Sequence, residues 1–452
     1  MLSIIFTVPD CRCDCHVRMH SHIKSHTPPT GAACFAGTAV VLMAAALHAQ
    51  TLVHPPYLHS YGIRKATPVH LFMFFGPRTS FRDPQGLATA KMRSRDDPAT
   101  EHDDDEVVVY GVNSGRHQLI YNTSMWTLSL YGSKGSGRDQ FNTPRGVACD
   151  PDGNVYVVDG GNNRIVQLFN PRRAVQWVRA FGRDAGLNAP SQVALDEWGR
   201  VYVSDTGNRR LVVFDSAGTL VDVIGSGEGG IAFTDGPTTL AVADGLNPWS
   251  YFRKERVIFC ADNRGGRIWK LRLDGGVVKK IRLPDGHRAS YAAVDYYHNL
   301  WLTDTRKHCV LKYDHSLALL DIFGSRGSGD NQFEEPRGIA IWKRYGQTFI
   351  AEKAGAQYYW IGTRLKEFRL RPGAHENRYV LHTDLTEYSY VTLFAAAAGD
   401  TSFFLRKRFI FPGPRRTSIT AAEAAGLQGA VLRVEPTYSS YTYYHTDHQI
   451  AP

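Results

Sequence analysis

The chain has 452 residues, of which 43% are hydrophobic and 21% are charged. These proportions are those of an ordinary globular protein, and they exclude a disordered or fibrous chain. The net charge of +9 favours acidic partners or surfaces, although the basic residues are spread along the chain. Seven cysteines in a chain of this length exclude a small disulfide scaffold.

The N-terminal region contains an apolar stretch, GAACFAGTAVVLMAAALHA, over residues 31–49. Its strongly apolar core, residues 39–47, is short for a membrane span. The pattern predicts a signal peptide over residues 1–49 with cleavage near Ala49, and a retained N-terminal anchor is the alternative. We therefore expect a secreted or periplasmic protein that has no membrane span after cleavage.

The first eighteen residues are unusual for a signal peptide. Their CxCxC spacing at Cys11, Cys13 and Cys15, followed by His16, does not match a standard zinc pattern. A start at the second methionine, Met19, gives a more ordinary signal peptide. We therefore interpret residues 1–18 as an over-extended start.

A repeat dominates the rest of the chain. The segment YGSKGSGRDQFNTPRGVA at residues 131–148 returns at residues 323–340 as FGSRGSGDNQFEEPRGIA. Weaker copies divide residues 81–373 into six units of roughly 45 residues, a period typical of propeller arrays. Each unit reads as four short strands, with Gly, Asp and Asn in the turns between them.

The second unit shows this pattern most clearly. A Pro-Arg-Gly loop at residues 144–146 precedes a first strand, and residues 155–159 read as a second strand that ends in an aspartate. The turn Gly-Gly-Asn-Asn-Arg at residues 160–164 leads to a third strand over residues 165–169. Such turn residues supply the positive φ angles that short hairpins require.

These patterns resemble NHL repeats, the units of six-bladed β-propellers, and the resemblance is strongest in the second and third units. It implies an all-β protein, exported and bacterial, with a six-bladed propeller over residues 66–373. Propellers usually close their ring by pairing a strand from one end of the chain with the blade at the other end. Residues 69–76 are a candidate for this clasp, and residues 364–370 compete for the same role.

The C-terminal region, residues 374–452, departs from the repeat. Residues 418–426 read as a short helix, and strands are predicted near residues 379–383, 390–395, 402–411 and 430–434. The pattern predicts a small β-sandwich-like domain and is loosely similar to the immunoglobulin-like modules that end many exported bacterial proteins. A seventh blade is the alternative.

Two sets of loops emerge on the same face of a propeller, because the strands of each blade run alternately up and down. They are the loop before the first strand, called here the first loop, and the loop between the second and third strands, called the second loop. Arginines in both sets predict a ring round the channel mouth that binds phosphate, carboxylate or sulfate groups. The first loops carry Arg145 and Arg337, and the second loops carry Arg116, Arg164, Arg209, Arg267 and Arg306.

A structural role is the alternative for three of these arginines. Arg164 follows the strand-ending Asp159 by five residues, and a local ion pair that stiffens the turn would explain this spacing without a ligand. The same alternative applies to Arg209 and Arg267. The two first-loop arginines have no obvious local carboxylate, so they are the first candidates for ligand binding.

No set of residues in the sequence indicates catalysis. The amidating lyase, which resembles this fold, holds zinc with three histidines near the channel, whereas here only His287 lies on a first loop. His117 and His308 lie on second loops, further from the channel. We therefore predict no catalytic residue and no cofactor, with neither calcium nor zinc indicated. The cysteines beyond the signal peptide are expected to be small apolar residues of the strands: Cys149, Cys260 and Cys309.

The leading interpretation is a monomeric, non-catalytic binding scaffold whose channel mouth binds a protein, a glycan or another anionic partner of the cell envelope. A metal-dependent lyase or hydrolase on the same face is one alternative, and it rests on family analogy. Polyanion or nucleic-acid binding is another, which the basic face favours. A signal peptide would direct the protein away from nucleic acids, so they are not expected as partners.

Overall fold

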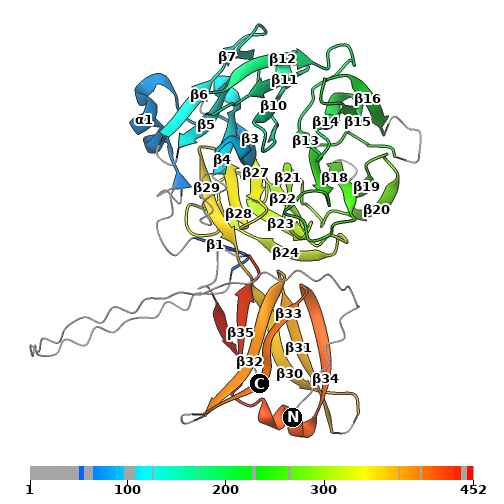
Figure 1. Ribbon diagram of the computed structural model, residues 1–452. Helices are drawn as coiled ribbons and strands as arrows, with labels where there is room; N and C mark the ends of the chain where they lie inside the picture. The colour runs from blue at the N-terminus through cyan, green and yellow to red at the C-terminus, as the bar shows by residue number, and fades with distance from the viewer. Residues whose placement is uncertain are drawn as a thin grey trace, which may run out of the picture.

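The computed structural model describes residues 50–54, 65–95, 107–124, 127–172, 174–225, 231–262, 266–375, 377–397, 400–438 and 445–450. The predicted signal peptide, residues 1–49, lies outside these residues. Most of the described chain is in strands, which form six consecutive sheets in a ring and two further large sheets beside it (Figure 1). None of the helices in the described ranges has the length and apolar character needed to cross a membrane.

Each sheet of the ring is an antiparallel blade, and the blades are numbered here in chain order. Blade 1 consists of β3 (Pro84–Lys91), β4 (Val107–Asn113), β5 (Gln118–Ser124) and β6 (Thr127–Tyr131). Blade 2 consists of β9 (Val147–Cys149), β10 (Asn154–Asp159), β11 (Arg164–Phe169) and β12 (Gln176–Phe181). Blade 3 consists of β13 (Val193–Leu195), β14 (Val201–Asp205), β15 (Arg210–Phe214) and β16 (Leu220–Ile224).

Blades 4 to 6 complete the ring. Blade 4 consists of β17 (Thr239–Asp244), β18 (Arg256–Asp262), β19 (Arg267–Arg272) and β20 (Val277–Arg282). Blade 5 consists of β21 (Tyr291–Val294), β22 (Leu300–Asp304), β23 (Cys309–Tyr313) and β24 (Leu319–Phe323). Blade 6 consists of β27 (Ile339–Trp342), β28 (Gln347–Glu352) and β29 (Gly355–Ile361), joined by β1 (Leu52–Val53) and β2 (Lys65–Ala66).

The hairpin of blade 2 shows why these sequences fold in this way. The strands β10 and β11 are rich in β-branched residues, and Val155, Val157 and Ile165 are buried. Between them a 3-10 turn, Gly160–Asn162, is followed by Asn163 in the left-handed conformation, with φ of 51°. Asparagine tolerates this conformation better than most residues, so the Gly-Gly-Asn-Asn sequence specifies the turn.

The two nearly identical segments of the repeat form the same structure twice. Each contains a short parallel ladder, β7 (Ser133–Lys134) with β8 (Gln140–Phe141) and β25 (Ser325–Arg326) with β26 (Gln332–Phe333). Phe141 and Phe333 are fully buried. Gly132 and Gly324 lie directly against these rings with φ of 97° and 101°, and a Cβ atom at either glycine would clash with the ring. This contact explains why both segments keep the same letters.

The ring closes between blades 1 and 6. The first strands β3, β9, β13, β17, β21 and β27 contact one another in that order, and β27 contacts β3. The N-terminal strand β1 completes the outer edge of blade 6, where Leu52 pairs with Ile361 and Val53 pairs with Trp360. The all-β propeller prediction is confirmed, with a ring of six sheets.

Both predicted clasps are wrong. Residues 69–76 lie largely in helix α1 (Pro68–Phe75), because Pro68 occupies its first turn and Thr67 makes a reciprocal capping box with His70. A short 3-10 turn, η1 (Gly76–Arg78), follows it. Residues 364–370 lie largely in β30 (Leu365–Pro372), which pairs with a C-terminal strand and not with the propeller.

The C-terminal region forms two sheets over one apolar core, which confirms the β-sandwich-like prediction and excludes a seventh blade. Leu381, Val391 and Leu432 from both sheets are buried together, and Ala424 of a short helix packs with them. The elements are β30, β31 (Arg378–Leu385) and β34 (Gly413–Thr420) in one sheet; β32 (Ser389–Ala397), β33 (Asp400–Ile410), β35 (Val431–Pro436) and β36 (Thr446–Gln449) in the other; and α2 (Ala421–Gly426).

A buried ion pair connects blade 5 to the C-terminal sheets. The Lys312 Nζ donates to Glu387 Oε2 at 2.5 Å, and neither side chain is exposed to solvent. Glu387 lies between β31 and β32 and also accepts from the backbone N–H of Tyr388 at 2.8 Å. The Tyr388 ring stacks on Tyr297 of blade 5 at 3.9 Å between centroids. The two parts of the molecule therefore share a junction that combines charge with aromatic packing.

Candidate functional site

The first and second loops of blades 1 to 5 line a recess of about 460 Å³ at the channel mouth. Most of its lining is small and polar, with hydroxyl groups from Thr143, Ser191, Thr206 and several other residues. The charged residues of the lining are one aspartate and three arginines: Asp83, Arg145, Arg288 and Arg306.

The three arginines of the recess are exposed and have no acidic partner. Arg145 precedes β9, Arg288 precedes β21, and Arg306 lies between β22 and β23. Among the described residues, no carboxylate forms an ion pair with any of their guanidinium groups. Their charges are therefore available to an incoming anion.

The single carboxylate of the recess is occupied. Asp83 forms an ion pair with the guanidinium of Arg337, which also contacts Glu335 at 3.1 Å. Lys353 makes a second contact with Glu335 at 2.8 Å. The pKa of Glu335 is held below its usual value mainly by hydrogen bonding to Lys353. Arg337 was predicted to bind ligand, but in this structure it holds the carboxylates beside the recess.

The predicted arginine ring is therefore only partly assembled. Arg145 and Arg306 line the recess, whereas Arg164 is buried within blade 2. Arg209 is exposed in a left-handed turn, and its neighbour Arg210 makes the ion pair of blade 3, with Asp205 at 2.8 Å. The remaining member, Arg267, begins β19 and lies opposite Asp262 in the strand register.

The structural alternative describes Arg164 well. Its Nε donates to Asp159 at 2.7 Å, and its other nitrogens donate to the backbone carbonyls of Ser136, Gly137 and Gln140. The side chain is 6% exposed and that of Asp159 is fully buried. This arginine ties the second loop to the preceding inter-blade loop, so its charge serves the structure of the blade.

Sequence reasoning missed Arg288. It lies in the first loop of blade 5, which lacks the Pro-Arg-Gly pattern that marked Arg145 and Arg337. Its backbone N–H donates to Asp304 at 2.9 Å, so the strand-ending aspartate of the same blade fixes the loop. The available signal was the position of Arg288 three residues before the predicted first strand of that unit, which begins at Tyr291.

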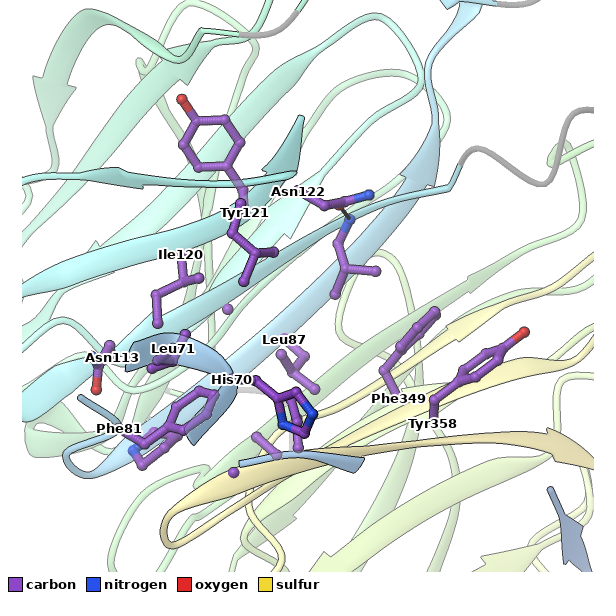
Figure 2. Close-up of a pocket in the computed structure, with 18 of the residues that line it drawn as sticks. His70, Leu71, Phe81, Leu87, Asn113, Ile120, Tyr121, Asn122, Phe349 and Tyr358 are labelled. Atoms are coloured by element: carbon purple, nitrogen blue, oxygen red, sulfur yellow. Dashed lines mark hydrogen bonds between the residues drawn. The ribbon is translucent and has the colours of Figure 1, made fainter. Parts of the chain in front are cut away.

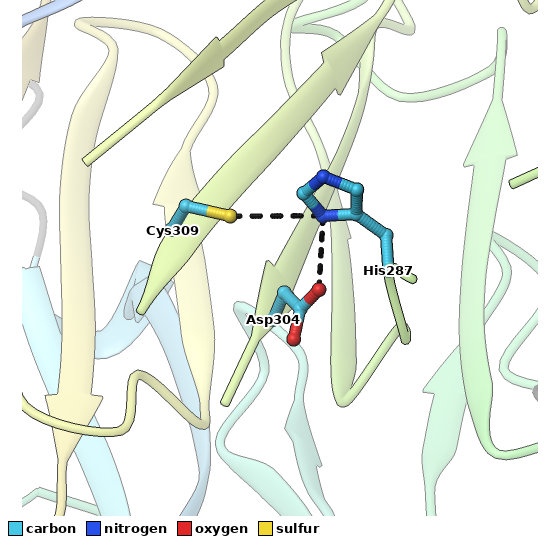
Figure 3. A group of neighbouring side chains, drawn as sticks. All are labelled: His287, Asp304 and Cys309. Carbon is cyan, nitrogen blue, oxygen red and sulfur yellow. Dashed lines mark hydrogen bonds and ion pairs between the residues drawn. The ribbon is translucent and has the colours of Figure 1, made fainter. Parts of the chain in front are cut away.

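Blade 5 also places three potential metal ligands together (Figure 3). His287 Nδ1 lies 3.0 Å from Asp304 Oδ2 and 3.8 Å from Cys309 Sγ. Asp304 and Cys309 are buried, and the His287 side chain is 15% exposed. Burial, followed by the charge of Asp304, raises the pKa of the Cys309 thiol to about 12. Within the described ranges, no other group of three such residues converges in this way.

A second cavity, of about 200 Å³, lies between blades 1 and 6 against α1 (Figure 2). Its lining is almost entirely apolar and includes Leu71, Phe81, Leu87 and Phe349. Leu71 is the buried residue of α1, so the helix covers this cavity instead of adding a strand to a blade. No Asp, Glu, Lys or Arg lines it, so it does not suit the anionic ligand that the loops predict.

Comparison with known proteins places an NHL repeat at residues 141–168, on blade 2. A search of curated proteins found no match. Among solved structures the chain is similar to an inactive virginiamycin B lyase from Staphylococcus aureus solved with quinupristin, at 13% identity and a TM-score of 0.40, covering 57% of this chain and 78% of that one. A Xanthomonas campestris gluconolactonase is similar at 12% identity and a TM-score of 0.43, covering 69% of this chain and 98% of that one. A calcium-binding regucalcin from Agrobacterium tumefaciens is similar at 9% identity and a TM-score of 0.43, covering 63% of this chain and 92% of that one.

Proposed function

We propose that this NHL-type β-propeller protein is a non-catalytic binding protein whose channel mouth holds an anionic group of a protein or glycan partner. The observation that carries the proposal is the set of three exposed arginines, Arg145, Arg288 and Arg306, round one recess. Guanidinium groups bind carboxylate, phosphate and sulfate groups through two parallel hydrogen bonds. The hydroxyl groups between the arginines supply further neutral donors.

The charge balance of the recess supports the same function. Its one carboxylate, Asp83, is neutralised by Arg337, so the potential at the mouth is set by the three remaining arginines. Arg337 therefore favours anion binding indirectly, because its removal would release the Asp83 carboxylate toward the ligand.

The signal-peptide pattern of residues 1–49 supports a location outside the cytoplasm, in the periplasm or beyond the cell. We propose that the partner is a component of the cell envelope that presents acidic groups, and that the protein binds it as a monomer. The acidic groups of such a partner would match the recess in sign.

The test compares the sulfated and desulfated forms of one oligosaccharide in equilibrium binding to the purified protein. We expect the sulfated form to bind and the double variant Arg145→Ala/Arg306→Ala to lose about 100-fold in affinity, since two charge-assisted contacts are removed. Arg209→Ala is the matched control, because Arg209 is also exposed and lies outside the recess.

Two results would contradict the proposal. Equal binding of the sulfated and desulfated forms would show that charge does not govern recognition. Undiminished binding by the double variant would place the anion site elsewhere on the protein. A salt titration distinguishes an extended polyanion from a single anionic group. The affinity for a polyanion, which contacts many cations, falls much more steeply with salt than the affinity for a group held by three arginines.

A further inference from the structure

We propose that His287, Asp304 and Cys309 of blade 5 form a binding site for a borderline-soft divalent metal ion of the zinc type. The site lies beside the anion recess but uses different side chains, so it is independent of the proposed function. Three observations carry the inference: a departure from the repeat, the convergence of three donor atoms, and the fixed orientation of the carboxylate.

The departure from the repeat concerns the partner of a buried aspartate. In blade 2 the strand-ending Asp159 pairs with Arg164, five residues later, at 2.7 Å. In blade 3 Asp205 pairs with Arg210 at the same spacing and 2.8 Å. In blade 5 the aligned residue is Cys309, which lies opposite Asp304 in the strand register. Blade 5 therefore has a thiol where blades 2 and 3 have a cation.

An imidazole from the first loop fills the space that the arginine leaves. His287 reaches Asp304 through Nδ1, and Cys309 approaches the same ring nitrogen (Figure 3). A nucleophile–base relay needs the thiol on one imidazole nitrogen and the carboxylate on the other. Because both groups meet Nδ1, the arrangement does not suit a relay and instead directs a nitrogen, an oxygen and a sulfur toward one point.

The spacing of the three donor atoms fits a metal ion. All three lie within 4.8 Å of one another. With Zn–S near 2.3 Å and Zn–N near 2.0–2.1 Å, a tetrahedral centre separates sulfur from nitrogen by about 3.6 Å. The observed distance from Cys309 Sγ to His287 Nδ1 is 3.8 Å. Only small side-chain movements are needed to admit the ion.

The carboxylate is already oriented by the backbone. Asp304 Oδ1 accepts hydrogen bonds from the N–H groups of Arg306 and Lys307 at 3.0 and 3.1 Å, and Oδ2 accepts one from Arg288 at 2.9 Å. Such outer contacts fix metal ligands in productive orientations. Thiolate, imidazole and carboxylate together favour zinc or cobalt over calcium and magnesium, which prefer oxygen ligands alone. Three protein ligands leave one position of a tetrahedral ion open.

The experiment is a cobalt titration of the reduced full-length protein, followed by displacement with zinc. We expect each chain to bind one cobalt ion, which zinc then displaces. The cobalt complex should show a sulfur-to-cobalt charge-transfer band and the visible spectrum of tetrahedral cobalt. Cys309→Ser should abolish the charge-transfer band. His287→Gln keeps a polar group beside Asp304 and should lower the affinity at least about tenfold.

Cys149→Ser is the matched control, because Cys149 is also a free cysteine on a strand and belongs to no group of converging ligands within the described ranges. It should retain the full cobalt spectrum. The proposal is overturned if the wild-type protein gives no thiolate–cobalt band, or if the band persists in Cys309→Ser, which would assign it to other thiols such as Cys11, Cys13 and Cys15. Circular dichroism of every variant, including His287→Gln, shows whether the fold is intact and so separates loss of the site from loss of the fold.

Discussion

Blades 2 and 5 are built from the same strand pattern but differ in side-chain charge at two positions of the third strand. The strand β11 of blade 2 begins with Arg164 and carries Gln167, and the aligned residues of β23 are Cys309 and Lys312. In blade 2 both side chains find partners inside the propeller: Arg164 bonds Asp159, and Gln167 bonds the Tyr156 hydroxyl at 3.2 Å.

In blade 5 the same two positions have different partners. Cys309 meets His287 of the blade's own first loop, and Lys312 pairs with Glu387 of the C-terminal region. The difference shows that both blades keep a strand-ending aspartate and a buried third strand, whereas the partners of these groups vary. Specialised features of the propeller are therefore expected where the partner changes.

The largest expected effect breaks the longer-range of these connections. Lys312→Met leaves the Glu387 carboxylate buried without its cation, and we expect a loss of about 3–5 kcal/mol in the free energy of unfolding. The aligned change in blade 2, Gln167→Met, removes hydrogen bonds to Tyr156 and Arg179 but leaves no buried charge without a partner, and it should cost about 1–2 kcal/mol. Urea denaturation measures both. The double variant Lys312→Met/Glu387→Gln should recover much of the loss, and equal costs in the two blades would contradict the comparison.

The next effect concerns the residue that follows each strand-ending turn. Arg164→Ala removes an ion pair and three bonds to backbone carbonyls, so we expect a loss of about 3 kcal/mol. Cys309→Ala removes one sulfur atom from a buried position and should cost about 1 kcal/mol in metal-free protein. If urea denaturation gives the same loss in the free energy of unfolding for both substitutions, Cys309 contributes more to stability than its observed contacts explain.

A smaller effect depends on pH and concerns the lysine of blade 4 that aligns with Lys312. Lys270 pairs with Glu255 at 2.5 Å, inside the propeller. Burial alone would raise the pKa of Glu255, but hydrogen bonds from His298 and Lys270 and the nearby His315 ring outweigh it and hold the pKa well below the usual value of 4.5. The ionised carboxylate therefore stabilises the folded state above pH 4.5, and this contribution is lost as the pH falls further.

Glu255→Gln tests this assignment. The variant should be less stable than the wild type at pH 7, and its free energy of unfolding should fall less steeply below pH 4.5. Denaturation measured at a series of pH values gives both slopes. Parallel pH profiles for the variant and the wild type would show that other carboxylates account for the acid sensitivity.

The smallest effect on stability is expected at the channel mouth. Arg145 is exposed and has no ion-pair partner among the described residues, so Arg145→Ala should change the free energy of unfolding by less than about 0.5 kcal/mol. Its effect should be on ligand affinity instead. A loss of stability comparable to that of Arg164→Ala would show that Arg145 shares the structural role of the buried arginine.

The parts of the fold that sequence reasoning predicted are those that local chemistry specifies. Hairpins such as Asp159 to Arg164 are encoded within six residues by glycine, asparagine and the flanking apolar strands. The repeated contact of a buried phenylalanine with a positive-φ glycine likewise lies within ten residues. The short helix near residues 418–426 was predicted, and it is capped by Thr420 and Glu423.

Most of what sequence reasoning missed depends on contacts between distant residues, and the remaining case is a local helix cap. Residues 69–76 and 364–370 resemble a clasp strand, but the strand that closes blade 6, β1, has only two residues and no pattern of its own. The apolar run after Thr67 was interpreted as a strand because the capping box with His70 was not recognised. His287 lies in the first loop and Cys309, 22 residues later, begins β23, and only the strand register brings them together.

The pairing of β1 with β29 has a consequence in time. His54 contacts the carbonyl of Tyr358, which lies 304 residues later in the chain. At synthesis rates of about 5–20 residues per second, the N-terminal strand waits about 15–60 s for its partner to be made. During that interval its backbone groups are unpaired, a state that favours association with other chains. The first strand to be synthesised is thus among the last to find its place.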